Sequence, residues 1–183
     1  MRRVGQDLGV DMSFYGDPDE LDRLAGRIEQ HAEEVRGHGS TMVRQAQAMR
    51  WKSIAADRCR ETVANDRKAL DAVATKLDEA AAALRRHAQQ VRELIAAIKR
   101  IGEAVVNWFN GAINRFNQAV DRFNQAVRDI ANAVASGLGI GGSPPQPPRP
   151  PWEGWQYQPH TLPPAGDKQW LDVGTFMRAR GVA

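Results

Sequence analysis

Two of the four histidines and the single cysteine are the residues whose types and positions could support chemistry. His31 and His38 are seven positions apart, a spacing that puts both on one side of a helix. A metal site would need further ligands at the same level, and the sequence places only Asp66 there. A polar layer between packed helices is the better interpretation, and a buried His38–Asp66 pair would make that packing sensitive to acid. Cys59 has no second cysteine to pair with and is interpreted as a small core residue.

Other signatures of catalysis are missing from the sequence. The glycine-rich stretch 139–142 precedes prolines rather than a helix, so its backbone N–H groups are not set up to bind phosphate. Charged residues make up 26% of the chain, but their signs alternate and no acid–base pair stands out. The sequence therefore predicts no enzyme, no catalytic residues, no metal site and no cofactor.

Composition narrows the class of partner. The net charge is only +3 and no basic stripe is concentrated anywhere, which argues against nucleic acid. No run approaches 18 apolar residues, so we expect no membrane span. Arg2 and Arg3 are not followed by an apolar segment, so we expect neither a Sec nor a Tat signal. With nucleic acid and a membrane span disfavoured, the expected partners are proteins.

Residues 17–101 are predicted to form a helical hairpin with its turn at 50–53. Asp17 precedes Pro18, which is a strong signal for a helix start, and Ser53 can cap the second helix. Large apolar residues recur every seven positions in both helices, which predicts an antiparallel pair with Val35 opposite Leu70. The predicted core consists of Leu21, Ile28, Val35, Met42, Val63, Leu70, Leu77 and Leu84.

The apolar stripe continues beyond the point where the first helix can cover it. A heptad repeat follows, in which Arg115-Phe-Asn-Gln-Ala-Val-Asp is succeeded at once by Arg122-Phe-Asn-Gln-Ala-Val-Arg. Its spacing is typical of a coiled-coil seam and predicts a third long helix over 103–136. The predicted interface, to be covered by a third segment of this chain or by another chain, comprises Val91, Leu94, Ile98, Ile101, Phe109, Ile113, Phe116, Val120, Phe123 and Val127.

The large residues of the repeat are one position out of phase with the row that ends at Val105. Either one helix continues through a change in packing, or the chain breaks near Gly102 and the third helix folds back. The phase change favours a break or kink.

The two ends of the chain have a different character. Residues 1–16 show no periodicity and are expected to be unstructured. Residues 137–183 form a tail rich in glycine, proline and tryptophan, predicted to be largely extended. Trp152, Trp155 and Trp170 are costly to leave in water, so we expect them to dock on the helices or on a partner. The predicted fold is therefore all-α, with a hairpin, a third heptad helix and an extended tail.

The turn Arg50-Trp51-Lys52-Ser53, the helices around it and the opening Tyr15-Gly-Asp-Pro-Asp-Glu-Leu resemble the WXG-type (Trp-x-Gly) family. These proteins are small helical hairpins exported by type VII secretion systems of actinobacteria and related Gram-positive bacteria. The resemblance covers about residues 14–100, and the turn signature falls on Trp51 and Ser53. It implies a homo- or heterodimer of hairpins, and members act as secretion substrates, chaperone-like partners or targeting modules.

Three features depart from that family's pattern. Ser53 stands where the family has glycine, and Trp152-Glu-Gly154 matches the signature only in a proline-rich tail. The family's Tyr-x-x-x-Asp/Glu export string fits Tyr15 to Asp19, but ahead of the first helix rather than after the second. We expect a non-enzymatic substrate or partner subunit of a type VII secretion system, secreted without a leader and in contact with the secretion machinery. The alternative is an intracellular coiled-coil adaptor that binds another protein through the third helix and the tail.

Overall fold

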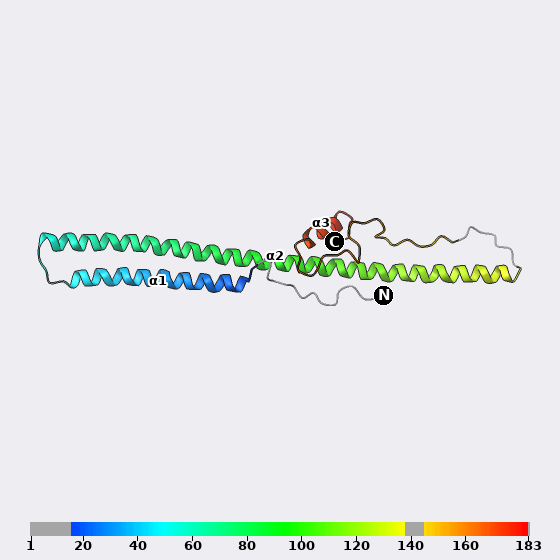
Figure 1. The fold of residues 1–183 in the computed structure, drawn as a ribbon, viewed down its shortest axis with the longest axis horizontal. Coiled ribbons are helices and arrows are strands. Elements are labelled where there is room, and N and C mark those ends of the chain that lie inside the picture. The colour runs from blue at the N-terminus through cyan, green and yellow to red at the C-terminus, as the bar shows by residue number, and fades with distance from the viewer. Residues whose placement is uncertain (1–15, 138–144, 183) are drawn as a thin grey trace. The chain divides into compact units, whose positions relative to one another are not determined.

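The computed structural model describes residues 16–137 and 145–182. Over these ranges the chain forms three helices and no strands: α1 (Pro18–Ala48), α2 (Ile54–Ala135) and α3 (Trp170–Arg178) (Figure 1). The predicted all-α architecture, a hairpin with additional helix, is confirmed. The chain divides into two compact units, one of residues 12–94 and one that contains residue 95 onward. Residues 1–15, and with them Tyr15, lie outside the described residues.

Both helices of the hairpin begin where the sequence predicts. The Asp17 carboxylate accepts a hydrogen bond of 2.9 Å from the backbone N–H of Asp19, and Pro18 occupies the first turn of α1. The Ser53 hydroxyl accepts one of 3.1 Å from the N–H of Ala56. Each cap satisfies a donor that the first turn of a helix leaves without an intrahelical partner. The two helices lie side by side and antiparallel (Figure 1).

Small residues form the centre of the hairpin seam. The buried residues of α1 include Ala25, Ala32, Gly39 and Ala46, and those of α2 in this unit include Ala74, Ala81 and Ala88. Such rows let two helix backbones approach closely. The eight large residues predicted as the core line the edges of this seam and are half-buried, except that Met42 is exposed.

The register of the hairpin differs from the predicted one. The prediction set Val35 opposite Leu70, but the structure places Gly39 there: a Cβ built on Gly39 would lie 3.5 Å from Leu70 Cδ1. The shift is about one helical turn. Its physical cause is volume, because a large side chain of one helix packs over a small residue of the other. The seven-residue period repeats this arrangement along the hairpin.

Ion pairs at the edge of the seam follow the same register. Arg36 pairs with Asp78, Arg85 with Glu29, and Arg92 Nη2 donates to Asp22 Oδ2 over 2.7 Å, so the α1 members are spaced seven apart. The hydrogen bond from Arg36 to Asp78 raises the pKa of the Arg36 guanidinium. These side chains are 37–48% exposed, so water and salt screen each pair strongly. The pairs therefore add little to the free energy of unfolding, and their main effect is to favour one register of α1 against α2.

The predicted break near Gly102 is wrong, because α2 runs without interruption from Ile54 to Ala135. The predicted third heptad helix is the second half of α2. Two rows of residues keep a strict period of seven through the helix. What changes along the helix is which row contains the large side chains. The first row is Ala74, Ala81, Ala88, Ile95, Gly102, Phe109, Phe116, Phe123 and Ile130, and the second is Leu70, Leu77, Leu84, Val91, Ile98, Val105, Ala112, Ala119, Ala126 and Ala133.

This exchange of sizes explains the apparent phase change. Apart from Ile95, large residues occupy the second row as far as Val105. Beyond it they occupy the first row, from Phe109, and the positions that follow the second row, at Ile113 and Val120. When only the large residues are compared, this exchange looks like a shift of the heptad pattern by one position. No residue is inserted or lost, so the helix has no reason to break.

The histidines take no part in the seam. His38 and Asp66 are both exposed, so the predicted buried pair does not form. His31 Nδ1 lies 3.0 Å from Glu34 Oε2, one turn along the same helix. The polar layer that the spacing predicted is therefore on the surface.

A test of the small-residue seam compares two neighbouring alanines of α2. Ala81 is 0% exposed, whereas Ala82 is exposed. We expect Ala81→Leu to destabilise the hairpin by about 1–3 kcal/mol because the added methyl groups force the helices apart. Ala82→Leu should change stability by less than about 0.5 kcal/mol. Denaturant unfolding followed by circular dichroism measures both, and equal effects would contradict the close approach of α1 and α2.

Candidate functional site

The hairpin turn, residues 49–53, is organised by an arginine from the first turns of α2. Arg60 Nε donates to the Ala46 carbonyl oxygen over 3.3 Å, and Nη2 donates to the carbonyl oxygens of Met49 (3.1 Å) and Trp51 (2.8 Å). Its Nη1 pairs with Asp57 at 2.8 Å. One guanidinium thus satisfies three backbone acceptors at the end of α1 and in the turn, which the helix itself leaves unpaired.

The tryptophan of the turn contributes its carbonyl to this network and leaves much of its side chain in solvent. Trp51 is 55% exposed, Ile54 is 77% exposed and Met49 is 41% exposed. We call these three residues the hairpin tip. Arg50 and Lys52, which flank Trp51, are also exposed. The tip is an apolar protrusion with a positive rim, held on a turn that does not need the indole ring for closure.

The second unit contains the part of α2 that the tail covers. Ile98, Val105, Phe109 and Ala112 are at most 2% exposed. α3 supplies the opposing apolar surface, with Trp170, Val173 and Met177 equally buried.

Gly174 allows the close contact between α3 and α2, and Gly102 lies under the Trp170 ring. A Cβ built on Gly174 would lie 2.9 Å from Ile101 Cγ2, and one built on Gly102 would lie 3.7 Å from the Trp170 ring. Trp170 is held from its polar side as well, because its Nε1 donates to the Pro164 carbonyl oxygen over 2.8 Å. Gly102, the predicted place of the break, is therefore a contact point for the tail.

The other two tail tryptophans pack on aromatic residues of α2. The Trp152 ring meets the edges of Phe109 and Phe116 at 6.0 Å between centroids, and Trp155 stacks on Trp108 at 5.3 Å with 13° between planes. The Trp155 N–H donates to the Trp152 carbonyl oxygen over 3.1 Å, closing a turn in which Gly154 has a φ of 73°. That glycine conformation directs both rings to the helix.

An outer layer covers Trp155. Phe176 meets Trp155 edge-on at 5.8 Å, and Tyr157 meets Phe176 at 5.2 Å. The Arg180 guanidinium lies 3.7 Å from the Phe176 centroid and 5.1 Å from that of Trp155. Such cation–π contacts add about 0.5–1 kcal/mol at exposed sites.

The structure brings only part of the predicted α2 interface under cover. Val91, Ile98 and Phe109 are buried, and Val127 is 42% exposed. The remaining predicted interface residues are half-buried: Leu94, Ile101, Ile113, Phe116, Val120 and Phe123. Sequence reasoning missed Arg60, Trp108 and the helical character of α3. The spacing of Trp170, Val173 and Met177 by three and four was a signal for α3.

Metal sites and membrane spans can be checked directly in the described residues. No group of three or more His, Cys, Asp or Glu residues in the described ranges could hold a metal. Within the same ranges, no helix is long and apolar enough to cross a membrane.

Arg60→Met tests the role of the guanidinium in the turn. The variant keeps the aliphatic stem but leaves three carbonyl oxygens without this donor, so we expect a loss of about 1–2 kcal/mol in hairpin stability. Arg58→Met, at an exposed position one residue from Cys59, is the matched control and should change stability little. Chemical denaturation measures the free energy of unfolding of both variants. Equal values would contradict the role of Arg60 in stabilising the turn.

Gly174→Val tests the docking of α3. The added Cβ would sit closer to Ile101 than carbon atoms tolerate, so we expect the tail to dissociate from α2. Trp152, Trp155 and Trp170 would then enter solvent, with a red shift in tryptophan emission and stronger quenching by acrylamide. Thr175→Val introduces the same side chain at the adjacent exposed position and should leave the emission unchanged.

The chain matches a family model described as "Putative T7SS secretion signal domain" over residues 3–161. No curated protein and no solved structure matches the chain significantly. The matched range contains the whole hairpin, the rest of α2 and the tail as far as Thr161, and so spans well over half of the sequence. The chain therefore belongs to the type VII (T7SS) secretion signal domain family.

Proposed function

We propose that this chain is a substrate or partner subunit of a type VII secretion system and acts by protein–protein contact without catalysis. The observation that carries the proposal is the exposed hairpin tip on a member of the secretion signal family. A rigid apolar protrusion is a typical anchor for a pocket on a partner, and tryptophan is enriched among such anchors. Arg50 and Lys52 favour a pocket with an acidic rim.

The hairpin also has apolar side chains outside its internal seam. Val73 is 51% exposed and Met42 is 40% exposed. They support the proposal that a related helical hairpin, from this or another protein, packs against the first unit as a homo- or heterodimer. Such a partner could also carry the export string that this chain lacks after its second helix.

Leaderless export through the type VII route is the localisation that follows from this proposal. A second candidate, an intracellular adaptor, is favoured by one feature: α2 beyond Phe116 is not fully buried at any position. An adaptor would use that surface within the cell and would not depend on a secretion ATPase. The two candidates therefore differ in where the protein accumulates.

Export is tested in a host with a type VII system by comparing culture supernatants with and without the secretion ATPase. We expect the protein in the supernatant only when the ATPase is present. Trp51→Ser should lower export several-fold without destabilising the hairpin, because the ring is exposed. Leu171→Ser makes a comparable apolar-to-polar change at an exposed position of α3 and should be exported normally. Retention of the wild-type chain in the cytosol, with its partner genes present, would favour the adaptor.

A further inference from the structure

The C-terminal part of α2 carries an apolar seam that the described residues leave half-covered. Beyond Phe116, which Trp152 contacts, no residue of α2 is fully buried, and Val127 and Val134 are 42% and 56% exposed. The two heptad rows continue here as Phe123 and Ile130 in one row and Ala119, Ala126 and Ala133 in the other. The seam is continuous in sequence with the stripe that the tail buries. It has the composition of an interface but is only half-covered.

The hairpin of the same chain shows how such rows pack. There α1 and α2 are antiparallel, and a large residue of one helix lies against a small residue of the other, as Leu70 does against Gly39. The C-terminal seam contains one large and one small row at the same period. It can therefore repeat this packing against a helix with the same two rows, and α2 of a second copy is such a helix.

We propose that the seam of residues 119–134 binds the same seam of a second copy, in antiparallel orientation. In one register, Phe123 packs on Ala126 of the second copy and Ile130 packs on Ala119. The two-fold symmetry of an isologous contact repeats each layer. Val120 then lies beside Val127 on one edge of the contact.

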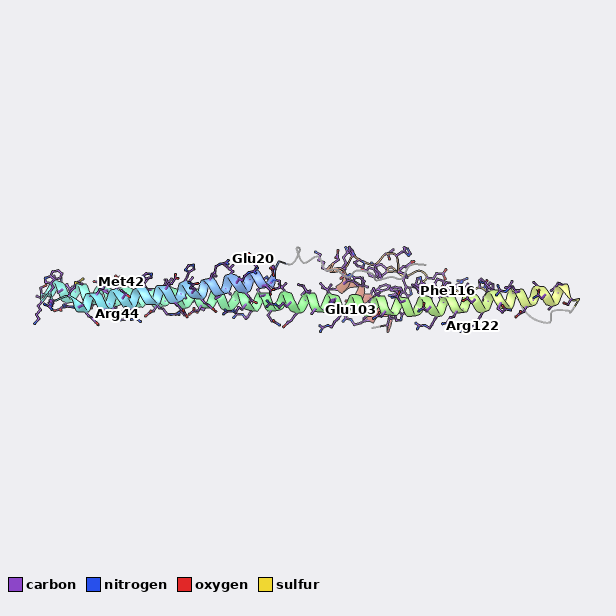
Figure 2. All side chains as sticks on the ribbon, turned by 90° about the horizontal axis from the view of Figure 1, so that it is seen from below. Glu20, Met42, Arg44, Glu103, Phe116 and Arg122 are labelled. Carbon is purple, nitrogen blue, oxygen red and sulfur yellow. The ribbon has the colours of Figure 1, made fainter. Side chains whose placement is uncertain are left out.

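Charge complementarity on the other edge supports the same register. Arg122 precedes Phe123 and Asp129 precedes Ile130, so both lie at the heptad position that flanks the seam. In the antiparallel register, Arg122 meets Asp129 of the second copy, and the symmetry makes two such pairs. Both residues are exposed, and Arg122 lies beyond Phe116 on the labelled view of α2 (Figure 2).

A parallel pair loses these advantages. Identical residues would then lie level, so that Phe123 would crowd Phe123 while Ala126 faced Ala126 across a gap. Like charges at positions 122 and 129 would also lie at the same level. The pattern therefore selects a second copy in antiparallel orientation.

The length of the seam sets the expected strength. Residues 119–134 span roughly 20–25 Å of helix, so the contact is smaller than a standard stable interface. We expect a dimer that dissociates in the range of about 10–100 μM, as suits a small interface. Such an equilibrium is measured by sedimentation of the full chain at rising concentration.

Charge exchange tests the proposal. Arg122→Asp sets two carboxylates against each other at both symmetric contacts, and Asp129→Arg sets two guanidinium groups against each other there. Each variant alone should therefore dimerise roughly ten-fold more weakly, because like charges at an interface repel. An equimolar mixture of the two variants should recover the dimer as a heterodimer. The double variant R122D/D129R should recover it as a homodimer.

Arg128→Asp is the matched control for these variants. It makes the same charge change as Arg122→Asp at an exposed position on the side away from the seam. We expect this variant to sediment as the wild type does.

Three outcomes would overturn the inference. They are a wild-type chain that stays monomeric above about 100 μM, single variants that dimerise as the wild type does, and a mixture that gains no heterodimer. The second outcome would assign self-association to another surface, such as the hairpin. The inference does not rest on the secretion proposal, because sedimentation of the purified chain and ATPase-dependent export are separate measurements.

Discussion

The uninterrupted seam of α2 is the constraint on which the rest of the structure depends. A helix of 82 residues with two apolar rows is stable in water only where another element covers those rows. α1, with 31 residues, covers the rows within the first unit, and the tail with α3 covers them in the second unit as far as Phe116. Removing apolar area from water contributes about 25 cal/mol per Å², so each cover contributes in proportion to the apolar area it buries.

The exchange of residue sizes between the rows matches the kind of cover. Where the hairpin forms, alanines such as Ala74 and Ala81 occupy the first row and admit a second helix at close range. Where the tail docks, Phe109 and Phe116 occupy that row and present faces and edges to tryptophan. Aromatic pairs add about 0.5–1.5 kcal/mol each beyond the area that they bury. A short segment with few helical turns can thus bind where a long helix would otherwise be needed.

Much of the fold follows from local signals in the sequence. The caps at Asp17 and Ser53 act within three residues, so the helix starts are predictable. The hairpin register is harder to predict, because pairing large residues with one another overlooks the packing of Leu70 on Gly39. Continuity through Gly102 depends on a row whose members change from alanine to phenylalanine. Arg60 could not be singled out, because its three acceptors meet only after the chain has turned.

The turn shows how structure and recognition are divided between residues. Ser53 supplies a cap that glycine, its counterpart in the WXG-type pattern, could not supply, and Arg60 satisfies the carbonyl oxygens. Closure of the turn is therefore complete without the indole of Trp51. A tryptophan that is 55% exposed beside two basic residues contributes little to the stability of the hairpin, since much of its apolar surface stays in water. Burial of that surface becomes favourable only when a partner covers it. Under the proposed function, the hairpin tip, rather than the seam beneath it, is therefore where a secretion partner would discriminate this chain from other helical hairpins.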